Sequence, residues 1–147
     1  MKLCIISPGK KHDTLVSPFI TEFEKRLTPY FTLEWIFPEA SDKKEEAKKI
    51  LGVIREDDSI FLLDEKGKSF TSLELANFLE IEKNKSTKRL VFIIGGAFGV
   101  DEEVKERAHK ILSLSELVFP HMLVRAILIE QLYRASTITF GGKYHHE

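Results

Sequence analysis

Short apolar runs alternate along the chain with longer stretches in which apolar residues recur every three or four positions. A short apolar run is typical of a β-strand, whereas recurrence at three and four positions predicts a helix with one buried face. The pattern predicts strands at residues 3–7, 33–37, 59–63, 89–94 and 111–114. It predicts helices at residues 13–27, 41–55, 72–81, 101–110 and 120–136, with a polar turn at residues 64–68.

Strands that alternate with helices favour a parallel sheet covered by helices on both faces. No linker, repeat or low-complexity tract interrupts this order, so residues 1–147 are expected to form a single α/β domain. The strand at 89–94 is apolar throughout from Leu90, which places it at the centre of the sheet. Ligands of such sheets bind beyond the carboxyl ends of the strands. The candidate ligand loops are therefore DEKGK, GGAFG and LSELVFP, each of which follows a predicted strand.

The last predicted helix is apolar around most of its circumference. A helix that is apolar all round must be buried all round, and a domain of this size seldom encloses its last helix. We therefore expect a homodimer whose interface covers it. The apolar members of the helix are Met122, Leu123, Val124, Ala126, Ile127, Leu128, Ile129, Leu132, Tyr133 and Ala135.

Charge and composition restrict the partners. The formal net charge is -1, so the surface as a whole lacks the attraction that nucleic-acid binding draws from Lys and Arg. A nucleic-acid target would require a local basic patch or a large partner recognised by shape. The single cysteine, Cys4, lies in an apolar run and is expected to be a buried hydrophobe in a reducing cytoplasm. No signal peptide and no apolar stretch of about 20 residues is present, so no membrane span is expected.

Several polar positions admit two interpretations each. The glycine run that starts at Gly95 has neither the GxGxxG spacing nor a Walker lysine, so it is either an ordinary tight turn or a ligand loop. His121 either bonds nearby backbone or takes part in catalysis. Glu130 and Arg134 stand four positions apart and predict an ion pair within the helix. Arg125 either extends to solvent or faces a polar partner across an interface.

The tail GGKYHHE places Tyr144 and His145 behind two glycines. Such a segment is suited to a flexible arm that carries acid/base or base-stacking groups. Two adjacent histidines are poor evidence for a metal site, and no other His, Cys or acidic residue has ligand spacing. No metal is therefore expected.

The order of these motifs resembles the RlmH family of SPOUT-type methyltransferases. The matching pieces are LDEKGK, IIGGAFG, LSLSELVFPHMLVRAILIEQLYRA and GGKYHHE, and KLCIISPGK matches in character, so the similarity covers essentially the whole chain. The resemblance implies a parallel α/β sheet with a C-terminal deep trefoil knot, an exception to the rule against threaded chains. It also implies a homodimer that uses S-adenosylmethionine to methylate N3 of a pseudouridine in large-subunit (23S) ribosomal RNA within the assembled ribosome.

The resemblance also implies roles for particular residues. Tyr144 and His145 match the family's terminal Tyr-His and are expected to contact the nucleotide, in a pocket completed by the tail of the other subunit. Arg134 is expected to bind phosphate or developing negative charge, while Glu130 and His121 position these groups. The expected cofactor-binding residues are Leu63, Gly95, Leu114, Ser115, Glu116, Leu117, Val118 and Phe119.

The tail departs from the family pattern at two positions. His146 replaces a customary Lys or Arg, and Lys143 stands where Pro or Ala is usual. Two alternatives to the enzyme therefore stay open: a cofactor-binding, ribosome-associated module without methyl transfer, and a nucleotide-binding regulatory dimer that uses GGAFG for phosphate. Binding of S-adenosylmethionine without methyl transfer would favour the first, and binding of nucleotides alone would favour the second.

Overall fold

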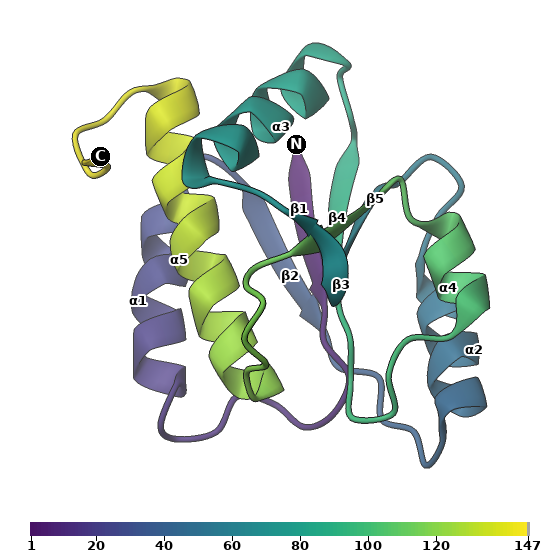
Figure 1. The fold of residues 1–147 in the computed structure, drawn as a ribbon. Helices are drawn as coiled ribbons and strands as arrows, with labels where there is room; N and C mark the ends of the chain where they lie inside the picture. Colours follow the sequence, from purple (N-terminus) through teal and green to yellow (C-terminus); the bar gives the residue numbers. More distant parts are fainter. Residues whose placement is uncertain (147) are drawn as a thin grey trace.

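The five apolar runs form one parallel β-sheet, as Figure 1 shows. A computed structural model describes residues 1–146 of the chain. The strands are β1 (Lys2–Ile6), β2 (Thr32–Ile36), β3 (Ser59–Ser69), β4 (Arg89–Ile94) and β5 (Lys110–Ser113). They lie in the order β2-β1-β4-β3-β5, and every neighbouring pair is parallel. All residues of β4 are buried, which confirms its predicted central position.

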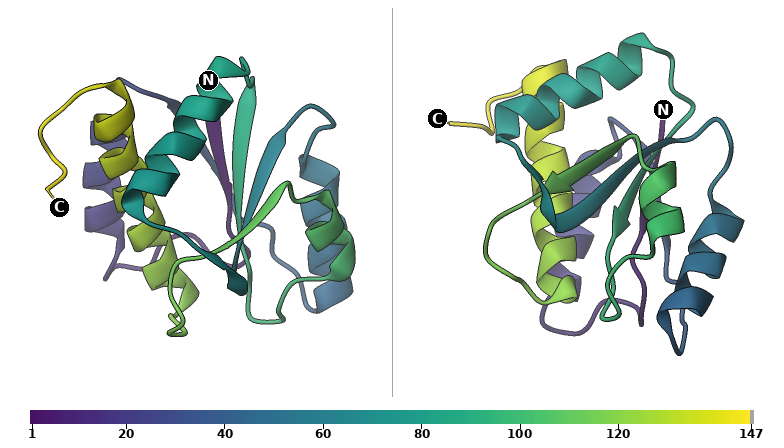
Figure 2. Two further views of the ribbon diagram at one scale, coloured as in Figure 1. Left: turned by 45° about the horizontal axis from the view of Figure 1, so that its top comes forward. Right: turned by 45° about the vertical axis from the view of Figure 1, so that its right-hand side comes forward.

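Helices cover both faces of this sheet, as the sequence predicts (Figures 1 and 2). They are α1 (Ser17–Leu27), α2 (Lys43–Val53), α3 (Ser72–Asn84), α4 (Glu102–Arg107) and α5 (His121–Phe140). α1, α3 and α5 pack on one face and contribute to one hydrophobic cluster with the sheet, whereas α2 and α4 contribute to a second cluster on the other face. The expected α/β architecture is therefore confirmed; the knot and the homodimer stay predictions.

Local side-chain contacts set where the helices begin. Thr71 and Glu74 form a reciprocal capping box at the start of α3, which satisfies backbone N–H groups that the helix leaves free. The Asp101 side chain caps α4 by accepting from the Glu103 N–H. Asp42 caps α2 by accepting from the Glu45 N–H, so that helix begins two residues later than predicted. α1 begins at Ser17 rather than residue 13, because the Asp13 carboxylate accepts hydrogen bonds from the next residues in a separate turn.

The polar segment 64–68 is not the predicted turn. β3 continues through it to Ser69, and both Leu63 and Lys68 are in register with Leu112 of β5, so the intervening residues bulge out of the ladder. Gly67 permits this arrangement: a Cβ at that position would lie 2.7 Å from the carbonyl carbon of Ile111. The prediction was wrong because the pairing with β5 comes from residues far along the chain, which a local polar pattern cannot report.

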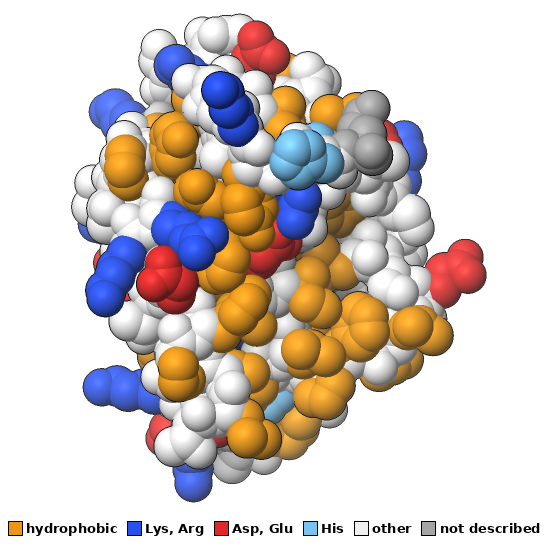
Figure 3. Space-filling view, turned by 90° about the vertical axis from the view of Figure 1, so that its left-hand side faces the viewer, with side chains coloured by type: hydrophobic (Ala, Val, Ile, Leu, Met, Phe, Trp, Pro, Cys, Tyr) orange, Lys and Arg blue, Asp and Glu red, His pale blue; other side chains and the backbone are white. Residues whose placement is uncertain are grey.

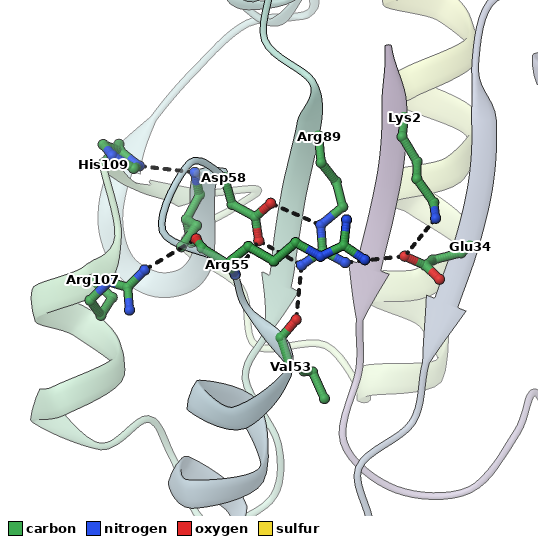
Figure 4. Close-up of polar contacts among 9 residues, drawn as sticks. Lys2, Glu34, Val53, Arg55, Asp58, Arg89, Arg107 and His109 are labelled. Carbon is green, nitrogen blue, oxygen red and sulfur yellow. Dashed lines mark hydrogen bonds and ion pairs between the residues drawn. The ribbon is translucent and has the colours of Figure 1, made fainter.

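A buried ion network joins the amino ends of the strands (Figure 4). The guanidinium of Arg89, on β4, donates from Nε to Asp58 at 2.9 Å and from Nη2 to the other Asp58 oxygen at 2.6 Å. It also lies 3.2 Å from Glu34 of β2. Burial alone would raise the pKa of Asp58, but hydrogen bonds from Arg89 and from the Arg55 backbone outweigh it and hold that pKa below its ordinary value. The two parallel hydrogen bonds between Arg89 and Asp58 allow only one relative orientation, so the network holds the amino ends of the strands in place.

The single cysteine is part of the core. Cys4 is fully buried on β1, and burial raises the pKa of its thiol to about 12. The side chain therefore stays protonated and packs as a small hydrophobe, which confirms the prediction.

Candidate functional site

Two adjoining cavities open at the carboxyl end of the sheet. The first cavity, of about 300 Å³, lies beyond β3, β4 and β5. Its walls come from three segments that are distant in sequence: the β3 bulge, the glycine run after β4, and the loop between β5 and α5. The lining residues are Leu63, Asp64, Glu65, Ile94, Gly95, Gly96, Ala97, Gly99, Val100, Leu114, Ser115, Leu117, Phe119, His121 and Val124.

Most of the expected cofactor residues meet at this first cavity. Leu63, Gly95, Leu114, Ser115, Leu117 and Phe119 line it. Glu116 and Val118 are exposed and do not. Ser115 shapes the loop, because its hydroxyl accepts a hydrogen bond from the Leu117 N–H at 3.0 Å and its carbonyl accepts one from the Ser113 hydroxyl at 2.8 Å.

The chemistry of these walls suits a ligand with an apolar, flat part and a polar rim. Leu and Phe side chains supply apolar surface, while the backbone of an irregular loop supplies N–H and C=O groups outside regular structure. Such sites are typically apolar with a few polar groups that fix the orientation of the ligand. The residues therefore fit an adenosine-containing cofactor.

The second cavity, of about 330 Å³, lies beyond β1 and β4 and shares Ala97 and His121 with the first. Burial, followed by the nearby positive charge of Arg125, lowers the pKa of His121, so this imidazole is neutral at physiological pH. The lining residues are Pro8, Gly9, Lys10, Pro38, Glu39, Ala40, Glu46, Ala97, Phe98 and His121.

Arg125, on α5, links that helix to the end of β1. It is fully buried and bonds polar groups of its own chain, so it neither extends to solvent nor faces an interface, and both interpretations above are wrong. Its Nε donates to the Ser7 hydroxyl at 2.6 Å, and its Nη2 donates to the Ser7 and Pro8 carbonyls at 3.4 Å. Burial lowers the pKa of Arg125 to about 10, so the group keeps its charge at neutral pH.

A separate polar cluster forms around the tail. Arg134 donates two hydrogen bonds to one Glu130 oxygen, at 2.7 and 3.0 Å, which confirms the predicted ion pair within the helix. The Tyr144 hydroxyl donates to the same oxygen at 3.1 Å. Burial and then this bond raise the pKa of Tyr144, so its hydroxyl stays protonated and donates a hydrogen bond.

His145 has one nitrogen engaged and one free. Its Nδ1 lies 3.2 Å from Nη1 of Arg134. A guanidinium can only donate, so Nδ1 accepts in this contact, and Nε2 carries the N–H. Nε2 is buried and has no hydrogen-bond partner within residues 1–146. A buried donor without an acceptor is costly and calls for a partner that completes it.

The tail cluster lies about midway along α5, whereas the cavities lie at the amino end of that helix (Figure 1). Glu130, which Tyr144 bonds, follows His121 by nine positions, a rise of about 14 Å along the helix axis. Among the described residues, none of the tail cluster lines either cavity. The structure therefore brings His121 to the cavities and keeps Glu130, Arg134, Tyr144 and His145 away from them within one protomer.

Comparison with known proteins assigns this chain to a family. The family model described as "Predicted SPOUT methyltransferase" matches residues 1–145. The chain belongs to the SPOUT methyltransferase family. A protein of Parabacteroides distasonis named "Ribosomal RNA large subunit methyltransferase H" is 40% identical over 157 residues, which cover 100% of each chain. Proteins of the same name from Cytophaga hutchinsonii and Bacteroides thetaiotaomicron are 39% and 36% identical, and cover 99% and 100% of this chain and 100% of their own length. The resemblance seen in the sequence is thereby confirmed.

Two further findings bear on this SPOUT chain. No helix in the described part of the chain is long and apolar enough to cross a membrane. Residues 1–146 contain no group of three or more His, Cys, Asp or Glu side chains placed to hold a metal ion.

Sequence analysis missed two residues that line the second cavity. Glu46 lies in a helix rich in Lys and Glu, where a charged residue is usually solvated, yet it is only 5% exposed. The signal was its spacing, because Glu46 stands four positions before the buried Ile50 and so shares its face. Phe98 lies within the glycine run, whose pattern drew attention to the glycines alone. The residue is 44% exposed.

Proposed function

We propose that this SPOUT methyltransferase uses S-adenosylmethionine to methylate N3 of a pseudouridine in large-subunit ribosomal RNA, within the assembled ribosome and as a homodimer in the cytoplasm. The observation that carries the proposal is the first cavity, which unites segments at the positions expected to bind the cofactor. The full-length similarity to proteins named ribosomal RNA large subunit methyltransferase H supports the choice of substrate. We also propose that the C-terminal part of the chain forms the family's deep trefoil knot.

The first cavity would hold the cofactor through its loop and apolar walls. Backbone groups of residues 114–119 would bond the adenine, while Leu63, Leu117 and Phe119 would cover it. Glu116 and Val118 would contribute backbone groups only. When bound, the cofactor supplies a methyl group already activated by a sulfonium. The protein must then align the target nitrogen with that methyl group. It must also assist removal of the proton that this nitrogen carries.

The tail cluster would supply groups for the nucleotide. N3 of pseudouridine loses a proton on methylation, and negative charge develops on the ring as it leaves. Arg134, which is always charged, would stabilise that charge or bind a neighbouring phosphate. Tyr144 and His145, held by Glu130 and Arg134 respectively, would contact the same ring. His121 would position the cofactor and the base from the cavity side.

A second protomer would bring these groups to the cofactor, because within one chain the tail is held on Glu130 and Arg134, about 14 Å or more along α5 from His121. A two-fold axis perpendicular to α5 makes two copies of that helix antiparallel, which sets the tail of one copy beside the cavities of the other. The Nε2 of His145, buried without an acceptor, would then find its partner across the interface.

An exposed apolar surface supports the same pairing. Hydrophobic side chains gather over the face formed by α1 and α5 (Figure 3). Large apolar residues on or next to it are solvent-exposed in the single chain: Leu15, Phe19, Leu117, Val118 and Leu123. Contiguous exposed apolar surface of this kind marks an interaction site, and a second copy would bury it.

The experiment that tests the function is transfer of labelled methyl from S-adenosylmethionine to intact ribosomes that lack the modification, with free large-subunit RNA alongside. We expect label at a pseudouridine in the ribosome and little label on free RNA, because a chain with a net charge of -1 has weak attraction for naked RNA. Cofactor binding without transfer, on a folded dimer, would refute the enzyme and favour the binding module. Equal transfer to free RNA would refute the need for the assembled ribosome.

A further inference from the structure

The second cavity lies where the connections of the sheet diverge. β1 and β4 are neighbours, but the chain leaves β1 toward β2 on one side and leaves β4 toward β5 on the other. The two connecting helices, α1 and α4, cover opposite faces of the sheet (Figure 2). The loops therefore separate above β1 and β4 and leave a crevice between them. In open parallel sheets this switch point is the preferred place for a ligand.

A largely buried carboxylate opens onto this crevice. Glu46 lines the cavity and is 5% exposed; its backbone N–H donates to the Asp42 carbonyl, but its carboxylate forms no hydrogen bond or ion pair with the side chains and backbone of residues 1–146. Its carboxylate packs against the glycine run: a Cβ on Gly96 would lie 2.9 Å from Oε2 of Glu46 and 3.0 Å from Cβ of Pro8. Gly96 is thus the residue that leaves room for this carboxylate. Burial raises the pKa of Glu46, as expected for an acid that lacks a donor.

The other walls suit a planar ring attached to a phosphate backbone. Phe98 lines the cavity with an aromatic ring that is 44% exposed. Lys10 lines it as well and is solvent-exposed, so its charge is available to a phosphate. Proteins that read RNA commonly stack an unpaired base on an aromatic side chain and bond its edge. The volume of about 330 Å³ falls in the range of small-ligand sites, roughly 300–1,000 Å³.

We propose that the second cavity binds the target base itself, extruded from the RNA, with Phe98 stacked on its face and Glu46 accepting a hydrogen bond from the ring N1–H. The inference rests on the proposed function and deepens it. Because the second cavity shares Ala97 and His121 with the first, a base held there adjoins the cofactor position. The pyrimidine is thereby placed for transfer to N3.

The role of Glu46 follows from the chemistry of pseudouridine. Its ring is joined to ribose through carbon, so N1 keeps a proton that uridine lacks. A site with a buried acceptor rejects an analogue that cannot donate, because the acceptor is then left unpaired. Glu46 would therefore determine specificity for pseudouridine, while the tail groups of the partner protomer act at N3 and its neighbours.

The test compares ribosomes that carry pseudouridine with ribosomes that carry uridine at the target position. Initial rates of methyl transfer give a preference ratio for the wild type, for Glu46→Leu and for Glu46→Gln. We expect Glu46→Leu to lower the ratio by about tenfold or more, which is the cost of one unsatisfied buried acceptor. Glu46→Gln keeps an acceptor oxygen and should lie between. Glu103→Leu, at an exposed acid on α4, should leave the ratio unchanged.

A purely structural role would give a different pattern. If Glu46 only supports the glycine run, its variants lose activity on both ribosomes equally, the ratio stays at the wild-type value, and the inference fails. A tenfold loss of S-adenosylmethionine affinity in Glu46→Gln, measured by calorimetry, would also overturn it, because the carboxylate would then serve the cofactor. No transfer by the wild type to pseudouridine-containing ribosomes would refute the proposed function itself, so the two failures are distinguishable.

Phe98 offers an independent arm of the test. Phe98→Ala should raise the KM for ribosomes about tenfold, because it removes the stacking of one base on one aromatic ring, and Phe98→Tyr should restore the KM. Ile81→Ala is the matched control, because Ile81 is also 44% exposed but lies on α3 away from the cavity. An unchanged KM in Phe98→Ala would exclude stacking of the base on this ring.

Discussion

A subunit-complementation experiment tests the composite site directly. One variant, Ser115→Trp, fills the first cavity and abolishes cofactor binding, because Ser115 lines that cavity. The other variant, Tyr144→Ala with His145→Ala, removes the tail groups. Each homodimer should be inactive in methyl transfer to ribosomes. The two are then co-expressed with different affinity tags, and the heterodimer is compared with the homodimers.

Symmetry fixes the expected result. In a heterodimer the intact cavity of the tail variant meets the intact tail of the cavity variant, so one of its two sites is complete. Random assortment makes half of the dimers heterodimers, so the mixture should recover about one quarter of wild-type activity, and the purified heterodimer about one half. This follows from the position of the tail, which bonds Glu130 midway along α5 and lines neither cavity of its own chain.

The opposite geometry predicts no recovery at all. If each chain used its own tail, every site in the heterodimer would carry one defect, and the mixture would stay at the background of the parents. Analytical ultracentrifugation confirms that both variants dimerise, so that a lack of activity cannot come from separated chains. Background activity from a verified heterodimer would refute the composite site.

Four further predictions concern individual residues. Asp58→Ala removes the bidentate partner of the buried Arg89 guanidinium, which keeps only Glu34 as a counter-charge, and should lower the free energy of unfolding by about 3 kcal/mol in urea at pH 7. Because the folded-state pKa of Asp58 is lowered, its stabilisation is present above about pH 4 and lost as the pH falls further; a deficit that persists unchanged in acid would contradict this. The Cys4 thiol, with a pKa of about 12, should react with a disulfide reagent at pH 8 only after unfolding, and rapid labelling of the native protein would count against its burial. Gly67→Ala places a Cβ 2.7 Å from the Ile111 backbone and should cost about 1–3 kcal/mol in thermal unfolding, whereas Gly52→Ala, which meets no atom within 4 Å, should not destabilise. His146→Arg restores a charge usual in the family and should raise the rate of methyl transfer to ribosomes; an unchanged rate would show that the tail does not need it.

The order of the elements could be predicted from the sequence because it depends on local periodicity. Each predicted strand and helix is present, and most differ from the structure only at their ends. α5 is the clearest case: it runs to Phe140, past the expected end at residue 136, because Thr137 and Thr139 bond carbonyl oxygens and cause no break. The Gly141 that follows, with φ of 92°, ends the helix.

Contacts between distant segments could not be predicted in the same way. The bulge of β3 depends on β5, which follows it by more than forty residues. The burial of Glu46 depends on Gly96 and Pro8, which come from two other loops. Local sequence describes each of these segments as polar, and only the parallel sheet brings them together at one edge. The candidate cofactor residues were placed by resemblance to a family, which carries such non-local information.

The order of the strands also determines when the protein can finish folding as it is synthesised. β1 is made first, yet it lies between β2 and β4, so the middle of the sheet stays open until residue 94 has been made. The larger hydrophobic cluster then still lacks Ala126, Leu128, Ile129, Leu132 and Ala135, all of which come from α5. A nascent chain therefore exposes apolar surface until α5 has been made, and such surface invites aggregation. The core of this protein cannot close one element at a time, because its first strand waits for its last helix.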